Sequence, residues 1–424
     1  MPPKENKKVR KGARGYKLPD PIPKGEILTD LTKQSWILGD PIGVGGFGAL
    51  YTAVASSKQS NDYDHVIKIE PHQNGPLFVE MHFYMRNASS DEIEKWKNKK
   101  KLSHLGVPKF ISNGSHERLG VKYRFLVMER FGKDLWKLFL ENGRQFPEVT
   151  VYRVAIQIID ALEYIHSKSY THGDIKGANL LLDKNNSKNV FLVDYGLAAK
   201  VSQTKEYKPD PKRAHNGTIE YTSRDAHIGI PTKRGDVEIL GYNLVQWLSG
   251  ELPWEKELKD PKSVHNAKLK ALSDVDVFLK DCFIKVPSAI RQYMHLLNEM
   301  EFNDTPNYAE MRSIFEKALQ RRRQQVYGEL VFPSTGASAS STATPESKAK
   351  KKKVEPGRVL RRRPAACEKI DLSPSDDSEK ITNGIVIDEK RIKLKNLKEI
   401  VDNIDDDSET EYDIKVLKKK TRQN

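Results

Sequence analysis

The spacing of apolar residues changes along this chain of 424 residues. Early segments rich in β-branched and aromatic residues, bounded by turn formers, predict strands at SWILGD, ALYTAVA, HVIKIE and YRFLVMER. Later segments have the apolar spacing of amphipathic helices, at TVYRVAIQIIDALEYIHS, DVEILGYNLVQWLSG and NYAEMRSIFEKALQ. The order predicts an α+β protein with a small β-rich lobe, a larger helical lobe and a cleft between them where a ligand can bind.

Composition divides the chain into three parts. Residues 1–25 are basic, contain Pro and Gly and lack apolar periodicity, which predicts a flexible N-terminus. Residues 26–332 carry the strand and helix patterns and form the expected folded domain. Residues 333–424 are rich in small polar residues that bury too little surface to offset chain entropy, so we expect a mostly disordered tail. Within the tail, 385–404 could form a short helix on binding a partner.

Charge and hydropathy narrow the classes of protein. The net charge is +14, and residues 1–25 carry eight basic and two acidic side chains, which concentrates positive charge at that end. No apolar run reaches the roughly 18 residues of a membrane span, so no membrane segment is expected. The chain has two cysteines, Cys282 and Cys367, which makes a disulfide framework unexpected and favours the cytosol or nucleus.

A glycine-rich segment, Gly43 to Gly48, fits the pattern G-x-G-x-x-G. A dinucleotide-binding fold requires a helix after this pattern, whereas a strand-like segment follows here. The context therefore favours a strand–turn–strand cover over phosphates, with an ordinary glycine-rich hairpin as the alternative.

Lys68 lies inside the apolar strand HVIKIE, 20 positions after Gly48. Its apolar neighbours would direct the ammonium into the cleft, where it can contact the α- and β-phosphates of ATP. A buried lysine requires a carboxylate partner, and Glu80 on the following helix is the best candidate. The alternatives are a solvated edge lysine and an exposed helix glutamate.

The segment THGDIKGANLLL fits the catalytic-loop pattern H-R-D-x-x-x-x-N, with glycine in place of arginine. Phosphoryl transfer needs a carboxylate that accepts the proton of the attacking hydroxyl, the role predicted for Asp174. Lys176 and Asn179 would neutralise the γ-phosphate and bind magnesium. A lysine two residues after the aspartate favours Ser/Thr over Tyr substrates. In the later segment VDYGLA, Asp194 would hold Mg²⁺.

Two further segments complete the pattern. In GTIEY, Thr218 can hydrogen-bond Asp174 and Lys176, and Asp236, which opens a predicted helix, would cap the backbone of the catalytic loop. A loop threonine and a helix N-cap are the alternative interpretations. Five such pieces in this order favour an ATP-dependent phosphotransferase.

These motifs resemble the protein-kinase superfamily and, more closely, the vaccinia-related kinases, which are relatives of the casein-kinase-one group. The resemblance rests on IGVGGFGALY, IKIEPHQNGPLFVE, THGDIKGANLLL, LVDYGLA, HNGTIEYTSRDAH and RGDVEILGYNLVQWLSGELPWE. It implies a bilobal kinase fold, ATP and Mg²⁺ as cofactors, a nuclear setting, and chromatin-associated protein substrates such as histone tails and the barrier-to-autointegration factor. We expect a monomer.

The resemblance also implies an adenine pocket. Backbone groups of the segment joining the lobes would bind the purine, Met128 would guard the back of the pocket, and Val66 and Leu181 would form its roof and floor. The predicted ATP-binding residues are Ile42, Gly43, Val44, Gly45, Gly46, Phe47, Gly48, Val66, Lys68, Glu80, Met128, Glu129, Phe131 and Leu181; the predicted catalytic residues are Asp174, Lys176 and Thr218, and the predicted metal ligands are Asn179 and Asp194.

Three departures from the general kinase pattern affect the expected mechanism. Gly173 replaces an arginine that, in the general pattern, binds the phosphate of a phosphorylated activation loop. Activity should therefore not depend on that phosphorylation. Asp225 takes the place of a glutamate that pairs with an arginine, and the hydroxyl of Tyr195 needs a partner if it is buried. Two other functions stay open, a scaffold without catalysis and a chromatin-binding protein whose kinase fold is secondary.

Two basic clusters in the tail suit a bipartite nuclear-import signal or contact with DNA phosphates. The alternative is a solvated run of charge. The clusters consist of Lys348, Lys350, Lys351, Lys352 and Lys353, and of Arg358, Arg361, Arg362 and Arg363.

Overall fold

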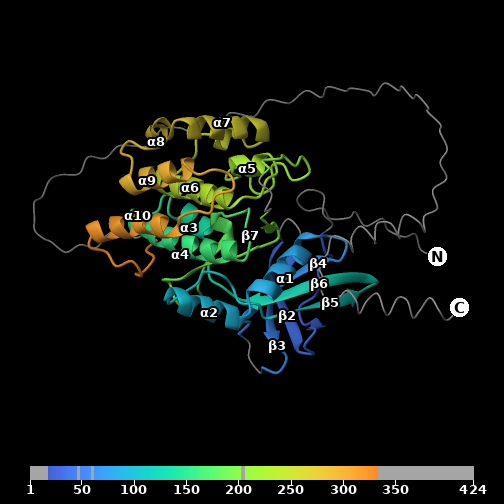
Figure 1. Cartoon of the computed structure of the whole chain (residues 1–424). Coiled ribbons are helices and arrows are strands. Elements are labelled where there is room, and N and C mark those ends of the chain that lie inside the picture. The colour runs from blue at the N-terminus through green and yellow to red at the C-terminus, as the bar shows by residue number, and fades with distance from the viewer. Residues whose placement is uncertain (1–17, 45–47, 59–61, 202–205, 333–424) are drawn as a thin grey trace, which may run out of the picture. The chain divides into compact units, whose positions relative to one another are not determined.

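The computed structural model describes residues 18–44, 48–58, 62–201 and 206–332 (Figure 1). The predictions for Gly45, Gly46 and Phe47 and for the tail 333–424, including its basic clusters, lie outside the described residues. Within them, no helix combines the length and apolar character needed to cross a bilayer.

The first lobe is built on one antiparallel sheet in the described part of the chain. Its centre contains the strands predicted from HVIKIE and YRFLVMER, in which Lys68 faces Leu126 across the pair. A polar strand that the sequence pattern did not predict, SNGSHER, forms one edge. In sheet order the strands are β1 (Ile27–Thr29), β2 (Ser35–Val44), β3 (Ala49–Ala55), β4 (His65–Pro71), β6 (Val121–Glu129) and β5 (Ser112–Arg118).

Two helices belong to this lobe, and α1 (Pro76–Asn87) lies beside β4 and β6 (Figure 1). Proline at its first turn suits the start of a helix, because that position needs no amide donor. The second helix, α2 (Ser90–Lys100), is too polar for its apolar pattern to predict it. Ser89 nevertheless caps the amide of Glu92, and this Ser-x-x-Glu spacing is a recognisable helix-start signal.

The second lobe is helical. Its central helix α6 (Lys233–Ser249) is buried along most of its length and packs with α4 (Glu148–Ser167). The other helices are α3 (Leu135–Glu141), α5 (Arg224–His227), α7 (Pro261–Ser273), α8 (Val275–Cys282), α9 (Ser288–Asn298), α10 (Tyr308–Arg321) and the 3-10 turns η2 (Gly177–Asn179) and η3 (Glu255–Glu257). Two short antiparallel pairs lie in the same part of the chain, β7 (Tyr170–Thr171) with β10 (Ala199–Lys200), and β8 (Leu180–Leu182) with β9 (Val190–Leu192).

Apolar packing confirms the two predicted lobes. One buried cluster contains Leu38, Ile67 and Phe125 of the sheet, and the larger cluster joins Leu77 of α1 to the helical lobe. The folded domain begins earlier than the predicted residue 26. Ile22 is 4% exposed, and its amide donates to the Tyr51 hydroxyl at 3.0 Å. Its apolar side chain fills the sheet core, a contact that local composition does not reveal.

Candidate active site

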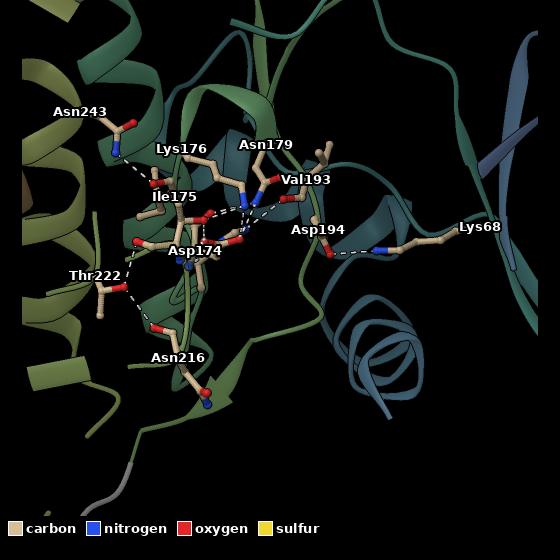
Figure 2. A network of polar contacts seen from close by, with 12 residues as sticks. Lys68, Asp174, Ile175, Lys176, Asn179, Val193, Asp194, Asn216, Thr222 and Asn243 are labelled. Carbon is tan, nitrogen blue, oxygen red and sulfur yellow. Dashed lines mark hydrogen bonds and ion pairs between the residues drawn. The ribbon is translucent and has the colours of Figure 1, made fainter. Parts of the chain in front are cut away.

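Lys68 lies between two carboxylates. Its Nζ is 2.6 Å from Glu80 Oε2 and 2.8 Å from Asp194 Oδ1. The strand β4 carries Lys68, and α1 carries Glu80. Asp194 follows β9 in the helical lobe, and Figure 2 shows its contact with Lys68. The contact with Glu80 was predicted, and the contact with Asp194 was not, although both residues had been singled out separately. These contacts join both lobes at one point.

Lys68 and Asp194 favour each other's ionised forms, whereas burial raises the pKa of Glu80. Burial alone would lower the pKa of Lys68, but the charges of Asp194 and Glu80 outweigh it and raise that pKa well above its usual value. Burial would likewise raise the pKa of Asp194, but the ammonium of Lys68 holds it below its usual range. Lys68 therefore keeps Asp194 anionic.

Asp174, Lys176 and Thr218 form a closed hydrogen-bonded triangle. Lys176 Nζ lies 2.7 Å from Asp174 Oδ2 and 2.8 Å from Thr218 Oγ1. Thr218 donates to Asp174 Oδ1 with its amide at 2.9 Å and its hydroxyl at 2.7 Å. The structure therefore brings together the three predicted catalytic residues, which lie up to 44 positions apart.

The two predicted metal ligands lie on adjoining segments. Asn179 uses its amide nitrogen to donate to the Asp174 carbonyl at 2.8 Å and to Asp174 Oδ2 at 3.2 Å. The amide of Val193, the residue before Asp194, donates to the Asn179 carbonyl at 2.9 Å. Figure 2 shows Asn179 and Asp194 at the two ends of this connection. A carboxylate and an amide oxygen are ligands that suit Mg²⁺.

Asp236 holds the backbone of the catalytic loop. Its carboxylate accepts from the amides of His172 at 2.7 Å and Gly173 at 2.8 Å, and His166 Nε2 lies 2.9 Å from the same group. The two contacts with backbone amides are those expected from the sequence, whereas the contact with His166 was not predicted. Gly173 has φ +77°, a conformation that favours glycine over residues with a side chain.

The described ends of the glycine-rich segment belong to or adjoin two paired strands, in agreement with its predicted context. Gly43 pairs with Leu50, and Val44 pairs with Ala49, in the β2–β3 hairpin. A Cβ atom at Gly48 would lie 2.4 Å from the carbonyl oxygen of Ile69, so the close approach of β4 requires glycine there. Ile42 and Val44 are 46% and 53% exposed, which leaves apolar surface for a ligand.

The residues predicted for the adenine pocket come from both lobes. Val66 and Met128 are cross-strand neighbours on β4 and β6, and both are buried. Leu181 of β8 is half-buried and pairs with Asp134. Phe131 stacks on Phe191 with ring centroids 4.3 Å apart.

Glu129 ends β6 with its side chain exposed, which leaves backbone groups as its means of contact with a purine.

The surroundings of the Tyr195 hydroxyl differ from those predicted. The side chain is fully buried, and its ring stacks on Phe83 with centroids 3.9 Å apart. Its hydroxyl has no hydrogen-bond partner among the described residues, although burial of a hydroxyl was expected to require one. Ring stacking on Phe83 and edge contacts with Tyr84 and His172 fix the side chain in its place.

Two residues near the site were missed by motif analysis. Arg234 pairs with Asp225 at 2.6 Å and is the partner that the shortened acidic side chain was expected to find. Glu70 lies two positions after Lys68 on β4, and its carboxylate accepts from the amide of Leu77 at the start of α1 at 2.5 Å. Side chains two positions apart on a strand share a face, so the segment IKIE already placed Glu70 on the face of Lys68, but no motif singled it out.

Comparison with known proteins agrees with this geometry. Residues 36–324 match the protein kinase domain family. The chain belongs to the protein kinase family and, within it, to the vaccinia-related kinases.

The chain is 46% identical over 352 residues to nucleosomal histone kinase 1 of Drosophila melanogaster, a match that covers 80% of this chain and 58% of the relative. It is 44% identical over 324 residues to the human serine/threonine-protein kinase VRK2, covering 74% of this chain and 61% of the relative. The match thus spans about three fifths of the length of these two relatives. The solved structure of vaccinia related kinase 3 superposes with a TM-score of 0.67 at 28% identity, covering 74% of this chain and 97% of that structure.

Proposed function

We propose that this protein is a serine/threonine protein kinase that transfers the γ-phosphate of ATP to hydroxyls of nuclear, chromatin-associated proteins. The observation that carries the proposal is the closed triangle of Asp174, Lys176 and Thr218, in a domain whose opposite lobe contributes Lys68.

Asp174 is the group suited to accept the proton of the attacking hydroxyl. Its carboxylate accepts hydrogen bonds from Thr218 at Oδ1 and from Lys176 at Oδ2, so its orientation is fixed before a hydroxyl donor binds. The ammonium of Lys176 lies beside it and can neutralise charge on the transferring phosphoryl group. Positioning and electrostatic stabilisation supply most of the catalysis in phosphoryl transfer, and these three residues would contribute to both.

The site also fits ATP with Mg²⁺. Lys68 is fixed to contact phosphates, and Asn179 and Asp194 would hold the ion, which supplies charge neutralisation at the phosphates when bound. Among the described residues there is no cluster of three or more His, Cys, Asp or Glu side chains that could hold a metal on its own. Mg²⁺ is usually bound through one or two protein carboxylates together with substrate phosphates, and Asp194 would be such a carboxylate here.

Two observations support the proposal of chromatin substrates: the name of a relative and the charge of the chain. The Drosophila relative is named a nucleosomal histone kinase, and this chain carries basic clusters at 348–353 and 358–363. Histone tails and the barrier-to-autointegration factor are therefore the substrates to test, with the chain acting as a nuclear monomer.

The test is transfer from labelled ATP with Mg²⁺ to purified histone H3 and to barrier-to-autointegration factor. Asp174→Asn keeps the size of the side chain and should lower the rate about a hundredfold or more, because it removes the proton acceptor. Asp91→Asn, at an exposed position in α2, is the matched control and should behave as wild type. An Asp174→Asn rate within about threefold of wild type would contradict the role of Asp174 as proton acceptor, whereas a wild-type protein that transfers no phosphate would favour the scaffold role.

A further inference from the structure

Lys268 of α7 is a fully buried lysine outside the catalytic triangle. Its side chain is 0% exposed, and its Nζ lies 5.3 Å from the ring centroids of both Tyr242 and Trp254. No ion pair to Lys268 is found in the described part of the chain. A buried ammonium without an ion pair is costly, so its hydrogen bonds must compensate for lost water.

Among the described residues Lys268 has three hydrogen-bond acceptors, and all of them come after Thr218 in the chain. Nζ donates to the carbonyl oxygens of Ile219 and Thr222, each at 2.7 Å, and lies 3.4 Å from His227 Nε2. Burial lowers the pKa of His227 to about 2, and the charge of Lys268 adds to that effect, so the ring is neutral and can accept at Nε2.

Thr222 connects Lys268 to the catalytic triangle. Its amide and its hydroxyl each donate to the Thr218 carbonyl at 2.9 Å, which closes a turn (Figure 2 shows Thr222 beside Asp174). Thr218 in turn donates to Asp174. Hydrogen bonds therefore connect Lys268 to Thr222, Thr222 to Thr218, and Thr218 to Asp174.

A second side chain holds the same backbone. Trp254 Nε1 donates to the Glu220 carbonyl at 2.8 Å. The carbonyls of Ile219, Glu220 and Thr222 are thus fixed by side chains that lie later in the chain, while Thr218 faces the catalytic aspartate.

Burial and nearby charges have opposite effects on the pKa of Lys268. Burial lowers its pKa to about 7, whereas the charges of Glu238 on α6 and Glu220 on the held segment oppose that effect. His227 on α5 and His265 on α7 also lie close to it, and their rings stack on each other.

We propose that Lys268 is a positioning residue for the protein substrate. Its hydrogen bonds fix the backbone of the segment 218–222, which keeps Thr218 hydrogen-bonded to Asp174. The same segment then offers a fixed surface to the substrate residues that flank the acceptor hydroxyl. This rests on the proposed kinase function. It assigns the lysine a role in the use of the protein substrate and none in the binding of ATP, because its contacts are to the segment 218–222 and to His227.

The decisive variant is Lys268→Met, which keeps the apolar stem and removes the donors. Kinetics are measured against purified histone H3 and, separately, against ATP. We expect kcat/KM for histone H3 to fall about tenfold or more, since small displacements of positioning groups have effects of that size, while KM for ATP stays within about twofold. Lys270→Met is the matched control, because it makes the same change at an exposed position of the same helix.

Lys268→Gln supplies a graded test, because its amide restores donors at the buried site and should recover part of the loss. The inference is overturned if folded Lys268→Met keeps wild-type kcat/KM, or if KM for ATP rises in parallel. It is also overturned if neither variant folds, since the lysine then supports the lobe as a whole. A wild-type protein with no transfer to any protein instead overturns the proposed function, which separates the two failures.

Discussion

Arg234 and Asp225 form a bidentate ion pair inside the helical lobe. Arg234 Nη2 lies 2.6 Å from Asp225 Oδ1, and Arg234 Nε lies 3.1 Å from Asp225 Oδ2. The carboxylate also accepts from Thr232 and from Tyr207, each at 2.6 Å, and is fully buried. The pair thereby ties the start of α6 to α5, which follows the segment that Lys268 holds.

Removal of one partner should destabilise the protein strongly. We expect Arg234→Met to lower the free energy of unfolding by about 3–5 kcal/mol, because Asp225 is left as an unpaired buried charge. Arg291→Met breaks an ion pair with Asp276 that is about half exposed, and it should cost about 1 kcal/mol or less. Denaturant unfolding of both variants measures the difference, and equal losses would contradict the expectation.

Lys68→Met should abolish phosphoryl transfer. The variant leaves Glu80 and Asp194 without their shared cation and removes the group placed to contact phosphates. We expect the rate constant for transfer to fall about a hundredfold or more and the thermal midpoint to decrease. Lys122→Met, at an exposed position of β6, is the control. Retention of most activity by Lys68→Met would show that another group positions the nucleotide.

Glu70 should make stability depend on pH. Burial raises its pKa to about 7, despite the opposing effects of the Leu77 amide and of Arg124. In the unfolded chain a glutamate has a pKa of about 4.3, so between that pH and about 7 the folded protein binds a proton that the unfolded chain has released. The contribution of Glu70 to stability therefore falls as pH rises through this window.

Glu70→Gln removes that titration. Its thermal midpoint, relative to wild type, should increase as the pH is raised from about 5 to about 8. The exposed Glu117→Gln on β5 should give a difference that does not vary with pH. A constant difference for Glu70→Gln as well would mean that its carboxylate is not protonated in this window.

The sequence indicated the residues of the proposed catalytic site more readily than the contacts that hold them in position. Asp174, Lys176 and Thr218 could be assigned because phosphoryl transfer requires those groups in that order, and local motifs carry them. Lys268 could not, since a lysine within a polar helix such as α7 is usually solvated, and its burial depends on Tyr242 and Trp254 from other elements.

The same limit applies to the fold. Helix α6 was predicted because its apolar residues are dense, whereas the strand β5 has the polar sequence SNGSHER and is specified by pairing with β6. Likewise, the packing of Ile22 depends on Tyr51, 29 positions later in the chain. Local periodicity contains no information about such partners.

The basic clusters of the tail should direct the protein to the nucleus. Replacing the lysines of 348–353 and the arginines of 358–363 by glutamine removes the charge that an import receptor or DNA phosphates would contact. We expect a fluorescent fusion to move to the cytosol while transfer to histone H3 in solution is unchanged. If the fusion stays nuclear and chromatin-bound, the signal lies elsewhere, and the basic residues 4–17 are the next to test.

Activity should not depend on phosphorylation of the activation segment. A phosphate there acts through a cationic side chain next to the catalytic aspartate, and that position is Gly173, whose amide is held by Asp236. A cavity of about 50 Å³ beside Gly173 is lined in part by Arg213, but that guanidinium is paired with Asp210 at 3.5 Å.

Phosphatase-treated protein, checked by mass spectrometry for loss of phosphate, should therefore transfer phosphate to histone H3 within about twofold of the untreated rate. The catalytic triangle explains this expectation, because Lys176 and Thr218 already orient Asp174 through their own hydrogen bonds. A loss of about tenfold that an upstream kinase restores would contradict it. Arg213→Met would then test which side chain binds the phosphate. If Arg213 leaves Asp210 to bind it, the upstream kinase should not reactivate the variant.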